Sequence, residues 1–163
     1  MSVHVLFVCL GNICRSPTAH GVFQQLVDSS GLHDAITVES AGTGDWHIGR
    51  APDQRAAAAA LQRGYDLSVL RARRVIAEDF NRFDFILAMD LQNLRALQQL
   101  RPANYRGELA LFLNYGNSHL REVPDPYYGN ADGFEHVLDL VEEAAHGLLQ
   151  AIVLKYNLPQ TRH

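Results

Sequence analysis

A cysteine and an arginine lie six positions apart in the segment CLGNICRS, which runs from Cys9 to Ser16. A thiolate is a strong nucleophile, and the planar guanidinium of Arg15 can hold two oxygens of a phosphate group at once. A free thiol with a pKa of about 8.5 is only a few per cent ionised near pH 7, so this chemistry needs neighbours that favour the thiolate. A helix dipole supplies only about 0.3 to 2 kcal/mol, so we expect the rest from loop amides, the Ser16 hydroxyl and Arg15. The pattern predicts attack by Cys9 on a phosphate ester.

The residues between Cys9 and Ser16 suit a loop that binds an anion through its backbone. Gly11 and Asn12 tolerate backbone conformations that turn several amide groups inward around an oxyanion. The predicted substrate-binding residues of this segment are Leu10, Gly11, Asn12, Ile13, Cys14 and Ser16. By itself a cysteine in an apolar strand is more often an inert buried residue, and Arg15 is the reason to prefer a catalytic role.

A proton donor for the leaving group is offered by Asp125, which lies between Pro124 and Pro126. General acid catalysis is worth about 10² to 10⁴ in rate, and the two prolines would hold the carboxyl group in place. An aspartate beside a proline is usually only a turn residue, so this role depends on the cysteine loop. No metal or cofactor is needed, since thiol, guanidinium and carboxyl cover the chemistry.

Three aromatic residues are predicted to surround the substrate: Trp46, Tyr127 and Tyr128. Trp46 lies in a glycine-rich stretch, where a core residue would be unexpected. Aromatic walls would favour an aryl phosphate over the shorter phosphoserine, although each of the three could instead be part of the core. A cluster of arginines, Arg71, Arg73 and Arg74, is interpreted as a solvated basic rim that could meet acidic phosphopeptides.

The second cysteine, Cys14, does not form a metal or redox motif with Cys9, because the two lie five positions apart and no histidine cluster adjoins them. One hypothesis is a disulfide that reversibly blocks Cys9, since a reactive thiolate needs a resolving thiol to escape overoxidation. The alternative is a cysteine that only packs. Two neighbouring cysteines do not make a secreted disulfide framework, so we expect a reducing, cytoplasmic location.

The elements that must position these residues alternate between strand and helix. Val5 to Leu10 reads as a strand buried on both faces, followed by a helix with Ser16 as N-cap and Pro17 in its first position, ending near Ser29. Further strands are predicted over 36–40, 83–90 and 109–113, and helices over 53–63, over 91–100 and from 132 to about 152, with an irregular stretch over 114–130.

This alternation predicts one α/β domain over 1–163, a three-layer sandwich with a four-stranded parallel sheet flanked by helices and the phosphate-binding loop after the first strand. The 163 residues include 47% hydrophobic residues, enough for one core. A net charge of -4 gives no general reason to bind nucleic acid or an anionic membrane, and no apolar run is long enough for a membrane helix.

Taken together, VCLGNICRSP and DPYYG resemble the low-molecular-weight protein tyrosine phosphatases. SAGT from Ser40, the DW at Asp45, GYDLS from Gly64, FDFILAMD and the NL at Asn93 follow in the order and spacing of that family. The resemblance covers the whole chain. It implies a metal-free phosphatase that acts on phosphotyrosine-containing proteins or peptides and is inhibited by inorganic phosphate and other oxyanions, with no nucleic-acid or membrane partner.

The resemblance also assigns roles to residues. It implies that Cys9 accepts the phosphate, that Arg15 clamps it, and that Asp125 is the acid that later activates water. Trp46, Tyr127 and Tyr128 would contact the phosphotyrosine ring, while Asn12, Ser16 and Ser40 would hold the loop in shape. The sequence departs from the family at Leu70, where a histidine often supports the loop, and we expect an altered rate rather than lost activity.

Three other functions fit the sequence less well than a tyrosine phosphatase. An arsenate reductase would need cysteines beyond Cys14, and the sequence has none. An arginine phosphatase loop looks like CTGNTCRS, with threonine in place of Ile13, and lacks the two tyrosines after the acid. A phosphate-sensing pseudophosphatase would have no reason to keep Cys9, Arg15 and Asp125 together.

Overall fold

The computed structural model describes residues 2–126 and 131–159, and within them the central element is a four-stranded parallel sheet. The strands are β1 (Val3–Cys9), β2 (Ile36–Gly42), β3 (Phe85–Ala88) and β4 (Glu108–Leu111), in the order β2-β1-β3-β4. Strand β1 pairs with β2 on one side and with β3 on the other; Val5, for example, lies opposite Val38 of β2 and Phe85 of β3. The predicted α/β fold with a parallel sheet is confirmed.

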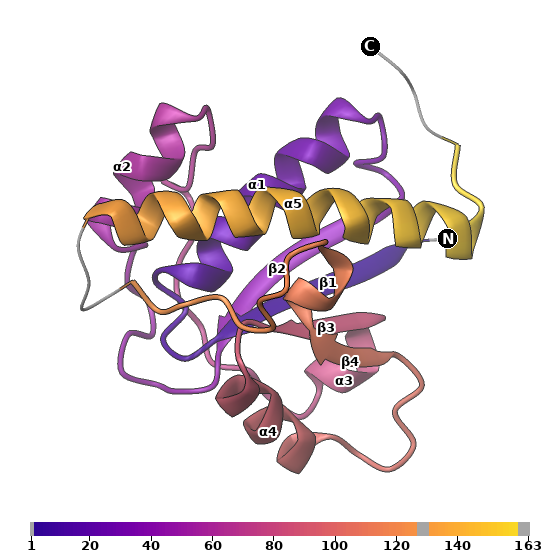
Figure 1. Ribbon diagram of the computed structural model, residues 1–163. Coiled ribbons are helices and arrows are strands. Elements are labelled where there is room, and N and C mark those ends of the chain that lie inside the picture. Colours follow the sequence, from indigo (N-terminus) through magenta and orange to yellow (C-terminus); the bar gives the residue numbers. More distant parts are fainter. Residues whose placement is uncertain (1, 127–130, 160–163) are drawn as a thin grey trace.

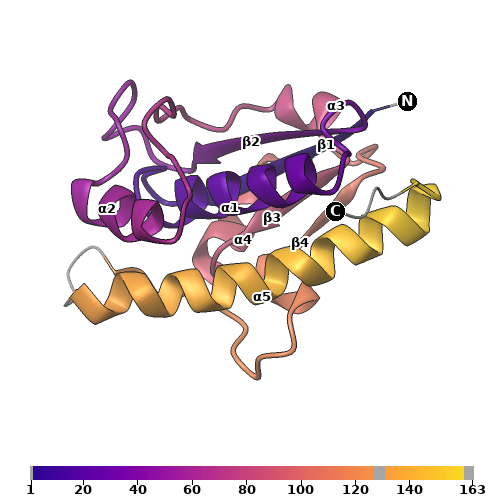
Figure 2. The ribbon, with the colours of Figure 1, turned by 90° about the horizontal axis from the view of Figure 1, so that it is seen from above.

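Helices cover both faces of the sheet (Figure 1). One face carries α1 (Arg15–Ser29) and the long α5 (Ala131–Tyr156), with α2 (Gln54–Gln62) beside them (Figure 2). The other carries α3 (Asp79–Arg82) and α4 (Leu91–Leu100). No helix in the described part of the chain is long and apolar enough to cross a membrane.

The alternation of side chains along β1 builds two cores at once. Phe7 and its same-face neighbours pack against α1 and α5, whereas Leu6 and Val8 point into the cluster under α3 and α4. All three of these side chains are fully buried. Because both faces of β1 are sealed, its carboxyl end is fixed in position, and that end is Cys9.

The beginning of α1 differs from the sequence prediction. The helix starts at Arg15, its N-cap is Cys14 rather than Ser16, and no side chain caps it. The reason is that the Ser16 hydroxyl lies against Cys9 and the Ala41 carbonyl oxygen, so it is not available to the helix amides. The predicted end at Ser29 is confirmed.

Two predicted strands end earlier in the structure. The predicted strand over 83–90 is shortened to Phe85–Ala88, because Asp90 leaves the sheet and caps α4 by accepting a hydrogen bond from the Asn93 amide. The predicted strand over 109–113 ends at Leu111, where a 3-10 turn (Phe112–Tyr115) begins. The four-residue α3 was not predicted.

Candidate active site

The loop over 10–14 joins the end of β1 to the first turn of α1, and its carbonyl groups point outward. The carbonyl oxygens of Cys9, Leu10 and Ile13 accept hydrogen bonds from the backbone amides of Thr43, Gly44 and Asp53, at 2.9, 2.9 and 2.8 Å. Since a peptide group points its N–H opposite to its C=O, this anchoring turns loop amides toward the enclosed space. The loop is therefore a preformed nest for an anion at a helix N-terminus.

Asn12 gives the loop its bend and holds it. Its φ of 57° lies in the left-handed region, which asparagine tolerates better than most residues. Its side-chain amide donates to Ser16 Oγ at 2.8 Å, and its Oδ1 accepts from the Arg73 backbone amide at 3.0 Å. The Arg73 contact provides outside support for the loop in a segment where Leu70 replaces the family histidine.

Gly42, at the end of β2, lets the loop approach the sheet closely. A Cβ placed there would lie 2.8 Å from the Leu10 carbonyl oxygen and 3.2 Å from the Asn12 nitrogen, both of them backbone atoms that cannot move aside. Any larger residue would therefore push the loop away from the sheet.

Cys9 is 3% exposed and its sulfur makes two hydrogen-bond contacts. The Asn12 amide donates to Cys9 Sγ at 3.2 Å, and Ser16 Oγ lies 3.0 Å from the same sulfur. The Ser16 hydroxyl has one proton to share between this sulfur and the Ala41 carbonyl at 3.3 Å. These contacts hold the sulfur in place at the base of the loop.

Arg15 is equally buried, at 3% exposed, and three groups fix its guanidinium. Nη1 donates to Asp90 Oδ2 at 2.7 Å and to the Val123 carbonyl at 3.0 Å, while Nη2 lies 3.6 Å from Asp125 Oδ2. Burial by itself lowers the pKa of Arg15, but the negative neighbours Cys9, Asp90 and Asp125 outweigh it and raise that pKa. The guanidinium therefore stays charged beside the sulfur.

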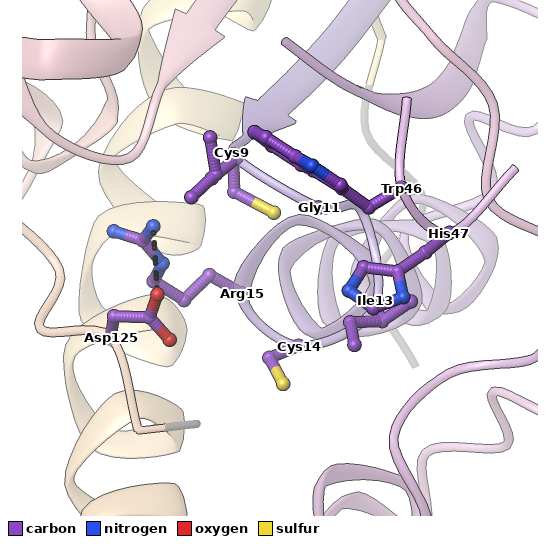
Figure 3. A pocket seen from close by; sticks show the side chains of 9 residues that line it. Cys9, Gly11, Ile13, Cys14, Arg15, Trp46, His47 and Asp125 are labelled. Atoms are coloured by element: carbon purple, nitrogen blue, oxygen red, sulfur yellow. Dashed lines mark ion pairs between the residues drawn. The ribbon is translucent and has the colours of Figure 1, made fainter. Parts of the chain in front are cut away.

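Together these residues enclose a pocket of about 380 Å³. Figure 3 shows Arg15 and Asp125 paired on one side, Trp46 and His47 on the other, and the Cys9 sulfur between them. The lining residues are Cys9, Leu10, Gly11, Ile13, Cys14, Arg15, Trp46, His47 and Asp125. The pocket is thus apolar on most of its wall and charged at one end.

Cys14 also reaches this pocket but behaves differently from Cys9. It is 5% exposed and packs with Ala56 and Phe134. Burial, and then the nearby charges of Asp53, Cys9 and Asp125, raise the pKa of Cys14 far above its ordinary value. Its thiol therefore remains protonated, so the two cysteines of one loop are a reactive and an unreactive thiol.

The predicted site residues divide into four groups. The lining set contains Leu10, Gly11, Ile13, Cys14 and Trp46, together with the three predicted catalytic residues. Asn12 and Ser16 are buried and hold the loop through hydrogen bonds. Tyr127 and Tyr128 lie outside the described residues. The Ser40 hydroxyl lies 3.1 Å from His20 Nδ1, so the contact seen here is with α1.

Sequence reasoning missed Asp90 and His47. Asp90 follows the buried run FILAM at the carboxyl end of a central parallel strand, where ligands of such sheets bind, and this position was the signal that could have identified it. His47 follows Trp46 directly but carries no motif of its own. No group of three or more His, Cys, Asp or Glu side chains arranged to hold a metal occurs within residues 2–126 and 131–159.

Comparison with known proteins agrees with this geometry. The family model described as low molecular weight phosphotyrosine protein phosphatase matches residues 4–157. A low molecular weight protein-tyrosine-phosphatase of Streptomyces coelicolor is 42% identical over 93% of this chain and 94% of its own.

Two crystal structures show the same fold. One is a protein tyrosine phosphatase of Entamoeba histolytica with Hepes in its active site, with a TM-score of 0.89, 37% identity and coverage of 96% of this chain and 99% of that one. The other is Wzb of Vibrio vulnificus in complex with benzylphosphonate, with a TM-score of 0.79, 30% identity and coverage of 93% and 99%. A match of this extent, on a chain whose thiol, guanidinium and carboxyl meet in one pocket, places the protein in the low molecular weight phosphotyrosine protein phosphatase family.

Proposed function

We propose that the protein hydrolyses phosphotyrosine in two steps through a phosphate bound covalently to Cys9. The observation that carries this proposal is the pair of contacts on the Cys9 sulfur, with the Asn12 amide donating at 3.2 Å and Ser16 Oγ at 3.0 Å, beside the buried guanidinium of Arg15. These groups place the sulfur at the floor of an anion-binding loop, which is the arrangement that phosphoryl transfer to sulfur requires.

In the first step the thiolate attacks phosphorus and the bond from phosphorus to the phenolic oxygen breaks. Asp125 protonates the departing oxygen as an S–P bond forms. Its carboxyl is 39% exposed at the pocket mouth, where the leaving group would lie, and 3.6 Å from Arg15 Nη2. Arg15 and the inward amides would stabilise the charge that spreads over the phosphoryl oxygens.

In the second step water attacks the cysteinyl phosphate. Asp125, now a carboxylate, accepts a proton from that water, the S–P bond breaks, and inorganic phosphate leaves with the Cys9 thiolate restored. The Ser16 hydroxyl would support the sulfur as leaving group, because its hydrogen bond becomes stronger as negative charge returns.

The substrate preference follows from pocket depth and lining. A phenyl ring carries the phosphate far enough to reach a sulfur that is 3% exposed, and Trp46 lines the same pocket (Figure 3). The complex of Wzb with benzylphosphonate, in which one methylene group joins the phosphonate to a phenyl ring, is consistent with an aryl substrate. We also propose that Tyr127 and Tyr128 contact the ring. Inorganic phosphate and other oxyanions are expected to inhibit the enzyme.

The same proposal includes the setting of the enzyme. We propose that 1–163 acts as one phosphatase domain and works in the cytoplasm, since a thiol nucleophile must remain reduced. Its partners are then phosphotyrosine-containing proteins or peptides.

The test is hydrolysis of p-nitrophenyl phosphate from pH 4 to 8 in EDTA by wild type, Cys9→Ser and Asp125→Asn, with phosphotyrosine, phosphoserine and phosphoarginine peptides in parallel. We expect turnover of phosphotyrosine without metal, no detectable activity for Cys9→Ser, and a kcat about 10² to 10⁴ lower for Asp125→Asn. Binding of phosphate without turnover by wild type would instead identify a sensor.

A further inference from the structure

A basic surface borders the pocket on the Trp46 side. Residues 45–50 and 68–74 together contain four arginines and one acid, Asp45. Two backbone hydrogen bonds join the segments, from the Gly49 amide to the Ala72 carbonyl at 2.8 Å and from the Ala72 amide to the Arg50 carbonyl at 2.9 Å. We call Arg50, Arg71 and Arg74, the three exposed arginines of these segments, the basic rim. This set corrects the prediction from the sequence, because Arg73 is half-buried and Arg50 is exposed.

The basic rim is held close to the substrate pocket. The Arg50 amide donates to the His47 carbonyl at 2.9 Å, and His47 lines the pocket next to Trp46. A turn of this kind keeps the first and fourth Cα atoms within about 7 Å of each other. Because an extended peptide advances about 3.3 to 3.6 Å per residue, side chains one to three positions from a bound phosphotyrosine come within reach of Arg50.

The charge of the basic rim is poorly neutralised within the protein. The neighbouring Arg73 does not belong to the basic rim, because its guanidinium donates two hydrogen bonds, both of 3.1 Å, to the fully buried Asp79. Arg71 donates to the carbonyl groups of Ser68 and Leu70, which carry no net charge. Arg74 has only an exposed contact of 3.8 Å to Asp45.

Arg50 is the arginine of the basic rim whose charge is least neutralised. Among residues 2–126 and 131–159 its guanidinium has no ion-pair partner within 4.0 Å. The whole chain has a net charge of -4, so an acidic peptide is attracted only where the local charge is positive. The Trp46 side of the pocket mouth is such a place, and Asp125 lies on the opposite side (Figure 3).

We propose that the basic rim, with Arg50 as its main contributor, selects phosphotyrosine sites that carry aspartate or glutamate within three positions of the phosphotyrosine. This inference rests on the proposed phosphotyrosine hydrolysis and names the class of substrate. The contacts are exposed, so each contributes modestly, but three arginines on one side of the mouth act on the same peptide.

The test compares two phosphotyrosine peptides of equal composition and net charge. In one the acidic residues flank the phosphotyrosine; in the other a glycine spacer moves them to the far end. We expect wild type to prefer the flanked peptide about tenfold in kcat/KM, and the preference to fall toward one in 0.5 M salt. Arg50→Ala should reduce the preference about three- to fivefold, and Arg50→Glu should abolish or invert it.

The matched control is Arg106→Ala. Arg106 is exposed but precedes β4, at the amino end of the sheet and away from the pocket, and should leave the preference unchanged. All variants should hydrolyse p-nitrophenyl phosphate at the wild-type rate, which also verifies folding. Wild-type hydrolysis of both peptides without preference, or a preference that Arg50→Glu does not alter, overturns this inference and leaves the proposed function intact. Failure of wild type on every phosphotyrosine substrate overturns the proposed function itself.

Discussion

The floor of the pocket and its rim are built in opposite ways. At the floor Cys9, Arg15 and Ser16 are buried and fixed by hydrogen bonds, Cys9 within its own loop and the other two to Asp90 and Ala41, which are far away in the sequence. At the rim Trp46 is 67% exposed and Ile48 is 58% exposed. The floor must hold charged groups ready for a transition state without rearrangement, whereas the rim must admit ring and peptide. Rigid chemistry and adaptable recognition are thus divided between two regions.

The largest effect should come from breaking the floor at Asp90. Asp90→Ala removes the carboxylate that holds Arg15 Nη1 at 2.7 Å and leaves a buried cation with less compensation. The guanidinium that Asp90 orients is a donor to the transferring phosphoryl group, and loss of one such oriented donor costs about 10² to 10³ in rate, so we expect kcat/KM for p-nitrophenyl phosphate to fall about 100-fold or more.

Two companion variants identify the cause. Asp90→Asn keeps the helix cap and the shape but not the charge, and should have intermediate activity. Glu122→Gln changes an exposed acid that accepts from the neighbouring Leu91 amide, and should stay close to wild type. Equal activity of Asp90→Ala and wild type would show that Val123 and Asp125 suffice to orient Arg15.

The second effect is on the pH dependence of stability, through His20 on α1. Burial lowers the pKa of His20 from 6.5 to about 4. Between these values the unfolded chain takes up a proton that the folded chain does not, so the free energy of unfolding falls as the pH falls through this window and levels off below about pH 4. The loss is at most about 3 kcal/mol, at 1.36 kcal/mol per pKa unit.

His20→Gln should remove most of this loss between pH 6.5 and 4, as measured by urea unfolding at several pH values. His33→Gln is the control, because that side chain is 62% exposed and folding leaves it in water. An unchanged pH slope in His20→Gln would mean that other groups account for the acid sensitivity.

Asn12 provides a third and smaller test of how rigid the floor is. Asn12→Ala loses the bonds to Ser16 and Arg73 and places a Cβ at a φ of 57°, while Asn12→Gly loses the same bonds without that strain. The left-handed conformation costs an ordinary residue about 1 to 2 kcal/mol, so alanine should lower the free energy of unfolding by about 1 kcal/mol more than glycine. Both should lower kcat, because Ser16 loses the contact that orients it.

A reversed order, with alanine more stable than glycine, would show that the loop changes conformation instead of bearing strain. Urea unfolding of the three proteins measures the order directly.

The residues that sequence analysis identified are those that carry a local pattern. Cys9, Arg15 and the loop between them form one contiguous motif, and the alternation of apolar residues made β1 recognisable. Asp90 was missed because its role depends on a contact with Arg15, 75 positions away, which no local pattern encodes. Ser16 was predicted both to cap the helix and to support the Cys9 sulfur; the first role is wrong, because the folded loop holds its hydroxyl against the sulfur and away from the helix amides.

The smallest effect should come from the rim. Trp46→Ala removes an aromatic wall from the pocket, but the ring is 67% exposed and its contact with a substrate would stay partly in water. Burial of apolar surface is worth about 25 cal/mol per Å², so a contact that covers part of one ring face contributes about 1 kcal/mol. We expect KM for p-nitrophenyl phosphate to rise about three- to fivefold with kcat within twofold of wild type. Trp46→Phe, which keeps an aromatic face, should recover most of the affinity. A fall in kcat larger than the rise in KM would mean that the rim takes part in the chemical step, and the division between a rigid floor and an adaptable rim would not hold.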